Sequence, residues 1–436
     1  MKHEDDMNQY VSEKIKMRPL NKKKIAQKTF FAAVSAVLFG VIACLTFVLL
    51  IPIFEDTFFP EERATIEFSE DTDFTIDEMN PEEMLLQDTP DLDIEEEIEE
   101  RIEALLPVMD EVSKIEEAEG LATEFSQLVD SWKKGYVTVS CVTSEVSFLD
   151  TTALQEYSAT GAIIADNGLE LLILVDDSFY KSQGSLEIEL YNGTIYRGEI
   201  YGQDSNSGLM VVAINKQNIP TETLENLEIV SLGTSNHNGL LGSMVVAYGN
   251  PMGSVDSVLY GVVSATKITV SAEDMNYYLV YTDMFGSENQ AGFLCELDGA
   301  ICGILTSKYS EDGMEQFITA IGISELKKTI EKMSNRLEIP YLGIESVEIS
   351  ETSYQTESIP RGAYVAKITL DSPAMQAGIL PGDFIVELDG KEIMTISQYT
   401  TQLYSLAANS TVSVVVARKT QGEYREIELE ITLGSL

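Results

Sequence analysis

Hydrophobic and polar positions divide the chain into three kinds of segment, and the first is a single apolar run. Residues 30–54, FFAAVSAVLFGVIACLTFVLLIPIF, contain no charged side chain over 25 positions. As a helix this run would be about 37 Å long, which exceeds the roughly 30 Å hydrocarbon core of a bilayer. The pattern therefore predicts one transmembrane helix.

A second kind of segment, over residues 121–337, is made of short runs rich in β-branched and aromatic residues. Turn dipeptides separate these runs, among them Asn167-Gly168, Asn192-Gly193 and Asp298-Gly299. Such runs joined by Asn-Gly or Asp-Gly turns are typical of antiparallel hairpins. We therefore expect a mostly β fold here, as a barrel or a sandwich.

A helical pattern closes this region, and a further β-rich unit occupies residues 338–436. Ser324 is a candidate N-cap for a helix with one apolar face, which is formed by Leu326, Ile330, Met333 and Leu337. The final unit combines alternating strands such as TVSVVVAR and EIELEITL with a short helix near residues 397–406. An α/β domain is expected at the C-terminal end.

The third kind of segment, residues 55–120, is acidic and has few apolar positions. Residues 55–119 carry 26 Asp or Glu against three Lys or Arg. Such a composition buries too little apolar surface to fold alone. We predict an acidic stalk or linker that holds the folded part away from the membrane. Calcium binding and a short coiled coil at the helical spacing of residues 94–105 are the alternatives.

The charge and composition of the chain argue against several classes of ligand. The net charge of −44 excludes nucleic acid, because a phosphate backbone would be repelled. With two histidines and four cysteines that form no CxxC pair, a zinc site is not expected, nor is any other metal or cofactor.

The basic residues before the apolar run predict how the chain is oriented across the membrane. Residues 14–28 carry seven Lys or Arg, so the positive-inside rule keeps the tail at residues 1–29 cytoplasmic and the remainder extracytoplasmic. This arrangement suits the cell membrane of a bacterium, crossed once. A cleaved signal peptide is the alternative, although no A-x-A site follows the apolar run.

The stretch DSPAMQAGILPGDFIVELDGKEI, residues 371–393, has the turns of a PDZ domain in their order, and the last unit resembles that family. PDZ domains bind chain ends by adding the peptide as a strand. The resemblance implies a carboxylate-binding loop at Tyr341, Leu342, Gly343 and Ile344, whose amides would form an anion nest. Protein or peptide C-termini, or hydrophobic segments, would be the partners. A domain used only for packing is the alternative.

Residues 125–436 as a whole resemble the HtrA-type (Deg-type) serine proteases, which join a chymotrypsin-like double β-barrel to a PDZ domain. The motif GNPMG at 249–253, the strand VLYGVVSA and the block TDMFGSENQAGFLCELDGAICGI carry the resemblance. It implies a double barrel at residues 121–337 and makes a homo-oligomer, such as a trimer, plausible.

The positions that match the catalytic triad hold other residues. Gln290 stands at the nucleophile position, Val175 at the base position and Gly208 at the position of the aspartate. A carboxamide cannot form an acyl-enzyme ester. Ser287 lies three residues before the nucleophile position, and His237 falls in a surface connection. Asp204 matches a turn acid, so no catalytic residue is assigned.

We therefore interpret the chain as a pseudoprotease that binds peptides or unfolded proteins and serves as scaffold, adaptor or quality-control factor. The alternatives are an active HtrA-type endopeptidase with an unrecognised catalytic arrangement, and a sensor that reports peptide capture to the cytoplasmic end.

The remaining candidate residues are expected to be structural. A two-residue turn at Asp298-Gly299 would place Cys295 opposite Cys302, as buried thiols or as a disulfide. Asp176 and Asp177 are expected at a solvated loop edge rather than in an acid–base or metal site.

Overall fold

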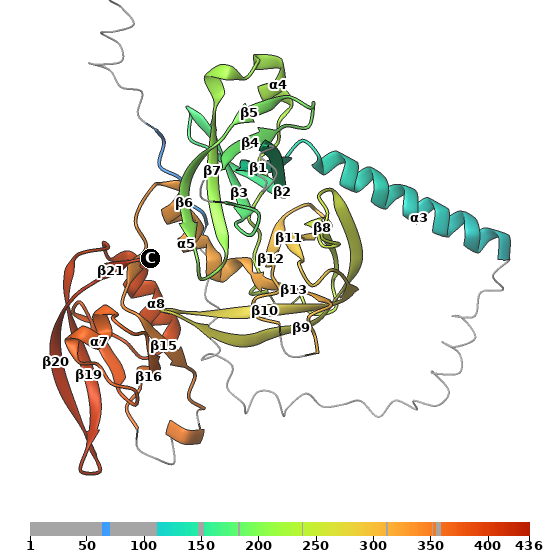
Figure 1. The fold of residues 1–436 in the computed structure, drawn as a ribbon. Helices are drawn as coiled ribbons and strands as arrows, with labels where there is room; N and C mark the ends of the chain where they lie inside the picture. The colour runs from blue at the N-terminus through green and yellow to red at the C-terminus, as the bar shows by residue number, and fades with distance from the viewer. Residues whose placement is uncertain are drawn as a thin grey trace, which may run out of the picture. The chain divides into compact units, whose positions relative to one another are not determined.

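The computed structural model describes residues 63–69, 111–146, 152–181, 184–237, 239–310, 313–350, 352–354 and 359–436 (Figure 1). The predicted cytoplasmic tail at 1–29, the predicted transmembrane helix at 30–54 and most of the predicted acidic stalk lie outside the described residues. Among the residues that are described, no helix is both long and apolar enough to cross a membrane. Residues 63–436 form one compact unit, to which the following description applies.

The predicted β-rich region contains two sheets, and the first has seven antiparallel strands in the order β5-β4-β1-β2-β3-β7-β6. Its strands are β1 (Tyr136–Val146), β2 (Thr152–Asp166), β3 (Glu170–Asp176), β4 (Ser185–Glu189), β5 (Ile195–Arg197), β6 (Glu199–Asp204) and β7 (Leu209–Asn215). The predicted turns at Gly168 and Gly193 have φ values of 95° and 77°, which glycine adopts without the strain of a Cβ atom. Strands β3 and β7 are buried almost throughout, as central strands of a packed sheet should be.

The second sheet is a closed barrel in the order β10-β13-β12-β11-β8-β9. Its strands are β8 (Met244–Asn250), β9 (Ser257–Ala272), β10 (Met275–Phe285), β11 (Ala291–Glu296), β12 (Ile301–Leu305) and β13 (Phe317–Gly322). Closure leaves no edge strand in this barrel. Strands β9 and β10 are the longest in it and form one hairpin, whose tip lies at residues 272–275.

Helix α5 (Ile323–Ser334) confirms the predicted helix but not its cap. Leu326, Ile330 and Met333 are buried, whereas Leu337 lies beyond the helix and is 57% exposed. The N-cap is Gly322 rather than Ser324, and no side chain at that position caps the helix. Instead the hydroxyl of Ser235 accepts a hydrogen bond from the Ser324 amide at 3.1 Å.

Helix α3 (Glu111–Trp132) crosses the boundary expected at residue 120 and leads directly into β1. Its last residue, Trp132, packs edge-on against Tyr248 of the barrel with ring centroids 6.3 Å apart. Two shorter helical segments, η3 (Lys216–Asn218) and α4 (Thr221–Asn226), connect β7 to the barrel.

The C-terminal unit has the expected α/β composition. A sheet in the order β15-β16-β17-β19-β20, with β18 beside β17, packs with two helices, and β14 pairs with β21. The elements are β14 (Pro340–Tyr341), β15 (Ile344–Val347), β16 (Ala363–Ile368), α7 (Pro373–Ala377), β17 (Phe384–Leu388), β18 (Lys391–Glu392), α8 (Ile396–Ser405), β19 (Thr411–Thr420), β20 (Glu423–Thr432) and β21 (Gly434–Ser435). The hydroxyls of Ser372 and Thr395 cap α7 and α8.

The hairpin that contains the two neighbouring cysteines differs from the prediction. The amide of Glu296 bonds to the carbonyl of Ala300, so the turn has three residues and ends on Gly299, whose φ is 89°. Cys295 therefore faces Ile301, and a register shift follows before Gly303. Both cysteines are free and buried, and burial raises the pKa of the Cys295 thiol to about 12.

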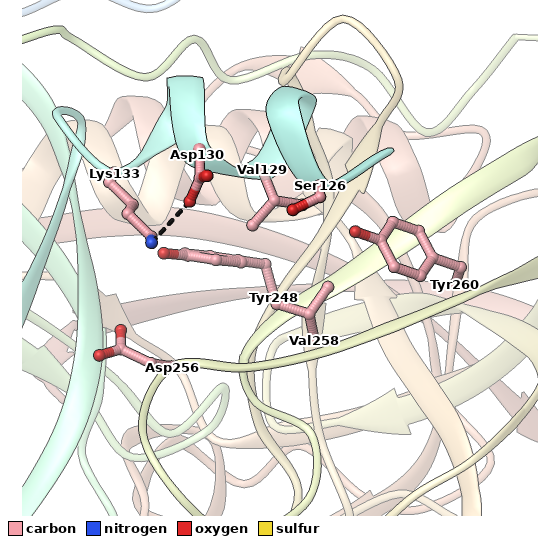
Figure 2. A pocket seen from close by; sticks show the side chains of 8 residues that line it. All are labelled: Ser126, Val129, Asp130, Lys133, Tyr248, Asp256, Val258 and Tyr260. Atoms are coloured by element: carbon pink, nitrogen blue, oxygen red, sulfur yellow. Dashed lines mark ion pairs between the residues drawn. The ribbon is translucent and has the colours of Figure 1, made fainter. Parts of the chain in front are cut away.

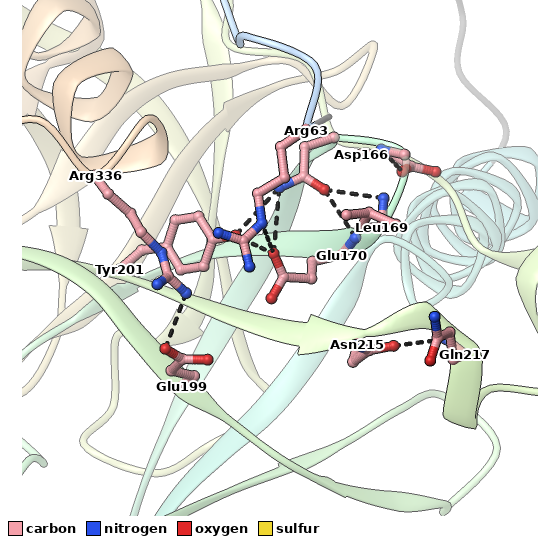
Figure 3. Close-up of polar contacts among 11 residues, drawn as sticks. Arg63, Asp166, Leu169, Glu170, Glu199, Tyr201, Asn215, Gln217 and Arg336 are labelled. Atoms are coloured by element: carbon pink, nitrogen blue, oxygen red, sulfur yellow. Dashed lines mark hydrogen bonds and ion pairs between the residues drawn. The ribbon is translucent and has the colours of Figure 1, made fainter. Parts of the chain in front are cut away.

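A short piece of the predicted acidic stalk, residues 63–69, lies against the folded body (Figure 3). Arg63 pairs with Glu170 at 2.9 Å, and the Glu170 carboxylate also accepts a hydrogen bond from the Tyr201 hydroxyl. Two guanidinium groups lie over the Tyr201 ring, that of Arg336 at 4.0 Å and that of Arg63 at 5.8 Å from its centroid. At least this part of the stalk is therefore attached to the folded unit.

We predict that Asp383→Ala will lower the free energy of unfolding by about 2–3 kcal/mol, because it removes a buried carboxylate that accepts hydrogen bonds from the partly exposed Arg418 guanidinium and from the Leu380 amide. Asp383 is 1% exposed, and both of its oxygens accept hydrogen bonds from Arg418, at 2.8 and 2.7 Å. The matched control is Lys367→Ala, whose 2.7 Å ion pair with Glu345 is largely solvated and should contribute less than about 1 kcal/mol. Equal losses in urea unfolding would contradict this prediction.

Candidate functional site

Gln290, which the sequence predicts at the nucleophile position, is held by the barrel that surrounds it. Its side chain is 3% exposed, its Nε2 donates to the carbonyl of Phe317 at 2.8 Å, and its Oε1 accepts from the amide of Thr319 at 3.2 Å. Both partners belong to β13, so the carboxamide joins the turn before β11 to that strand. These two bonds use the side chain for structure rather than directing it at a substrate.

The other two predicted triad positions lie in the first sheet and in the turn that enters its strand β7. Val175 is fully buried in β3 opposite Met210 of β7, within a cluster of apolar side chains. Gly208 precedes β7 with a φ of 71°, and its carbonyl accepts a hydrogen bond from the Asp177 amide at 2.9 Å. Neither position presents a group that can accept a proton from a hydroxyl.

The residues that could replace a missing triad member, His237, Ser287 and Asp204, form hydrogen bonds to other groups. The nitrogens of His237 face Glu296, at 3.3 Å, and the amide of Gly239, at 3.2 Å. The hydroxyl of Ser287 accepts a hydrogen bond from the Asn289 amide. Asp204 is buried in a turn, where its carboxylate accepts hydrogen bonds from the amide and the hydroxyl of Ser207. None of these hydrogen bonds joins a serine to a histidine.

The paired acids at the end of β3 are half-buried rather than solvated. Asp176 accepts a hydrogen bond from the Ser178 amide, and burial raises the pKa of its carboxyl. Asp177 accepts one from the side chain of Gln203 at 2.7 Å. Among the described residues, no group of three His, Cys, Asp or Glu side chains is arranged to hold a metal ion.

The predicted carboxylate-binding loop holds a carboxylate, and that carboxylate belongs to the chain itself. The amides of Leu342 and Gly343 both donate to Oδ2 of Asp274 at 2.7 Å, and the amide of Ile344 donates to Oδ1 at 3.2 Å. Three of the four predicted residues thus supply converging amides. The fourth, Tyr341, lies in β14 and pairs with Gly434.

Gly343 gives the loop this shape. Its φ is 87°, a conformation that favours glycine, and a Cβ atom there would come within 2.3 Å of the Ser372 Cβ. Successive amides that turn toward one point form an anion-binding nest, which is the geometry needed for a terminal carboxylate.

Helix α8 completes the site around Asp274. The Tyr399 hydroxyl donates to Oδ1 of Asp274 at 2.7 Å, and the Thr400 hydroxyl donates to its carbonyl at 3.3 Å. Asp274 is 2% exposed, and burial raises the pKa of its carboxyl, an effect that the amides and the Tyr399 hydroxyl oppose. The carboxylate is therefore well bonded but costly to keep out of water.

The backbone beside Asp274 lies along β15 in the manner of an added strand. Glu273 forms an antiparallel bridge with Glu345, and the Asp274 amide donates to the carbonyl of Ile344 at 2.7 Å. One residue pair further along, the Ser271 hydroxyl donates to the carbonyl of Ser346 at 2.7 Å. Asp274, Tyr399 and Thr400 were not identified from the sequence, where SAEDMN reads as an ordinary hairpin turn.

Away from this loop, a hollow with a volume of about 370 Å³ lies under helix α3. Figure 2 shows its lining from α3 and the barrel: Ser126, Val129, Asp130, Lys133, Tyr248, Asp256, Val258 and Tyr260. Lys133 and Asp130 form an ion pair at 2.6 Å within this lining.

Comparison with known proteins supports both the C-terminal PDZ domain and the protease-like barrels that precede it. A family model described as PDZ domain matches residues 340–431. The chain is similar to "Serine protease Do-like HtrA" of Bacillus subtilis, with 28% identity over 292 residues that cover 63% of each chain. It is also similar to "Periplasmic serine endoprotease DegP" of Salmonella typhimurium, with 23% identity over 291 residues, which cover 64% of this chain and 58% of that protein.

A variant of the HtrA-type protease AlgW, solved with a tripeptide, has the same fold. Its TM-score is 0.50 at 20% sequence identity, and the match covers 71% of this chain and 97% of the other. The double barrel followed by a PDZ domain is therefore confirmed as the architecture. The matched segment spans less than two thirds of the length of the two bacterial relatives.

We predict that Gln290→Ala will destabilise the protein by about 1–3 kcal/mol, because it leaves the buried Thr319 amide without its partner and removes one of two hydrogen bonds to the Phe317 carbonyl. Glu288→Ala, an exposed change in the same turn, is the control and should alter stability by less than about 0.5 kcal/mol. Thermal or urea unfolding measures both. An unchanged midpoint for Gln290→Ala would mean that the carboxamide has no structural role.

Proposed function

Because the chain is a homologue of the HtrA-type serine proteases with a C-terminal PDZ domain, we propose that it is a peptide-binding protein without proteolytic activity. It would be anchored by residues 30–54 and act outside the cytoplasm on protein C-termini, as a scaffold, adaptor or quality-control factor. A trimer, plausible by the resemblance, is part of this proposal.

One observation carries the binding half of the proposal. The amides of Leu342, Gly343 and Ile344 converge on a single carboxylate at distances of 2.7, 2.7 and 3.2 Å. Hydrogen bonds from backbone amides to an ionised oxygen are stronger than those between neutral groups. A carboxylate has two acceptor oxygens, so it can accept the hydrogen bonds of all three amides at once. A chain terminus that extends β15 would supply such a group.

The catalytic half of the proposal depends on the residues at the triad positions. Loss of a triad serine or histidine typically lowers the rate by about 10⁶, and residual catalysis over water is about 10³–10⁴. Here the three positions hold a carboxamide, an alkyl group and no side chain. Without a base to remove its proton, a nearby hydroxyl such as that of Ser287 remains a weak nucleophile.

We predict no covalent labelling of the purified chain by a fluorophosphonate probe and no cleavage of unfolded casein. Gln290→Ser should also remain unlabelled, because the serine would have no imidazole beside it. The Bacillus subtilis relative HtrA serves as the positive control. Labelling of the natural chain, or cleavage that a serine-protease inhibitor stops, would establish the alternative of an active endopeptidase.

A second prediction concerns peptide binding by the full chain. Peptides with a free C-terminal carboxylate should bind at least tenfold more tightly than the same peptides with a C-terminal amide, as measured by fluorescence anisotropy at high peptide concentration. Gly343→Ala should abolish the difference, since its Cβ would collide with Ser372. Gly422→Ala, which strains a φ of 94° in the β19–β20 turn at the other edge of the sheet, is the matched control.

Equal binding of acid and amide peptides would show that the nest does not recognise a terminal carboxylate. That result would remove the binding half of the proposal and leave the question of catalysis untouched.

A further inference from the structure

The groove that a peptide would use is already filled by another part of the chain. In strand addition, a peptide lies along the edge of the sheet and its terminal carboxylate enters the nest. β15 is the edge strand of the C-terminal sheet, and α8 contacts the same carboxylate from its other side. The β9–β10 hairpin tip takes this place, with Glu273 bridged to Glu345 and the Asp274 carboxylate in the nest.

Asp274 reproduces each interaction expected of a bound C-terminus. Its two oxygens accept three amide hydrogen bonds, and its amide bonds to the carbonyl of Ile344 as a peptide strand would. The neighbouring Glu273 accepts a hydrogen bond from the Thr369 hydroxyl at 2.7 Å. The hairpin therefore uses both parts of the binding mode, the nest and the strand edge.

Two carboxylates cannot occupy this nest together. Each of the three amides has one proton, and each already donates it to Asp274. A second negative charge within a few ångströms would also be strongly repelled in a site that excludes water. An incoming terminus must displace the hairpin tip before it can bind.

We propose that the tip of the β9–β10 hairpin, residues 272–275, is an internal pseudo-ligand that keeps the peptide groove closed, with Asp274 in place of a terminal carboxylate. This inference rests on the proposed function, because it concerns the same groove. External C-termini gain access when the hairpin leaves, so the groove has a closed state and an open state.

Features of Asp274 favour a closure that can be reversed. Its φ of 59° is a left-handed conformation that a non-glycine residue adopts at some cost. Within the described part of the chain, its buried carboxylate accepts hydrogen bonds from three amides and the Tyr399 hydroxyl rather than from a cation. Both costs are relieved when the tip moves into water, whereas a peptide terminus would bring its own carboxylate to the vacated amides.

The fraction of chains with an open groove sets the apparent affinity for an external peptide. The apparent dissociation constant equals the intrinsic constant divided by the fraction of chains with an open groove. Opening in about one chain in a hundred would thus weaken binding about a hundredfold. A substitution that removes the internal carboxylate should restore that affinity without altering the groove.

The test compares the full chain with Asp274→Gly, using a fluorescent peptide that has a free C-terminal carboxylate. Glycine tolerates the left-handed turn, so the substitution removes the carboxylate with little strain. We expect the apparent affinity to increase at least tenfold. Asp256→Gly is the matched control, since Asp256 has a φ of 58° but is exposed in the turn before β9, and its affinity should equal that of the natural chain.

A second variant closes the groove by a covalent bond. Because the Asp274 amide bonds to the carbonyl of Ile344, Glu273 and Glu345 are a non-hydrogen-bonded pair, and such pairs have Cα atoms about 4.5 Å apart. That separation suits a disulfide. In Glu273→Cys/Glu345→Cys, oxidation should abolish peptide binding and a reductant should restore it.

The outcomes separate this inference from the proposed function. If the natural chain binds the peptide as tightly as Asp274→Gly, or if the oxidised double variant still binds, the groove is not closed by the hairpin and only the inference fails. If no variant binds any peptide with a free carboxylate, the proposed function fails and the inference fails with it.

Discussion

The interaction on which this account depends is the set of hydrogen bonds between one carboxylate and the loop that begins the C-terminal domain. Asp274 accepts hydrogen bonds from three successive amides and from the Tyr399 hydroxyl. Gly343 makes the loop geometry possible, because its positive φ turns the amides toward one point. All four donors are thus occupied by a carboxylate from the barrel domain. In the proposed mode of binding, the same four donors would give both the specificity for a terminal carboxylate and its inhibition by Asp274.

The barrel contributes to this arrangement through its stability. Its longest hairpin carries Asp274 and is anchored in a closed sheet, where β10 pairs with both β9 and β13. Gln290 strengthens the same sheet by bonding two backbone groups of β13. A fold that supports chemistry in its relatives would then serve here as a rigid support for the segment that competes with peptides. This role needs the barrel but none of the triad side chains.

Local patterns were enough to predict many of the elements. The turns at Gly168 and Gly193 and the apolar face of α5 follow from features within a few residues. The loop at Leu342, Gly343 and Ile344 was implied by the resemblance of the last unit to PDZ domains. The errors share a different cause. Ser235, which caps α5, lies 89 residues before the amide that it binds, and a three-residue turn moved Cys295 away from Cys302. Asp274 lies 68 residues from Leu342, and nothing in SAEDMN marks a turn that reaches another domain.

Amide hydrogen exchange at Leu342, Gly343 and Ile344 in the full chain, without added peptide, tests the central claim most directly. Amides that are buried and bonded to a carboxylate exchange only when the site opens. We expect slow exchange at all three positions in the natural chain and fast exchange in Asp274→Gly. Fast exchange at these amides in the natural chain would show that the nest is empty and would contradict closure by the hairpin.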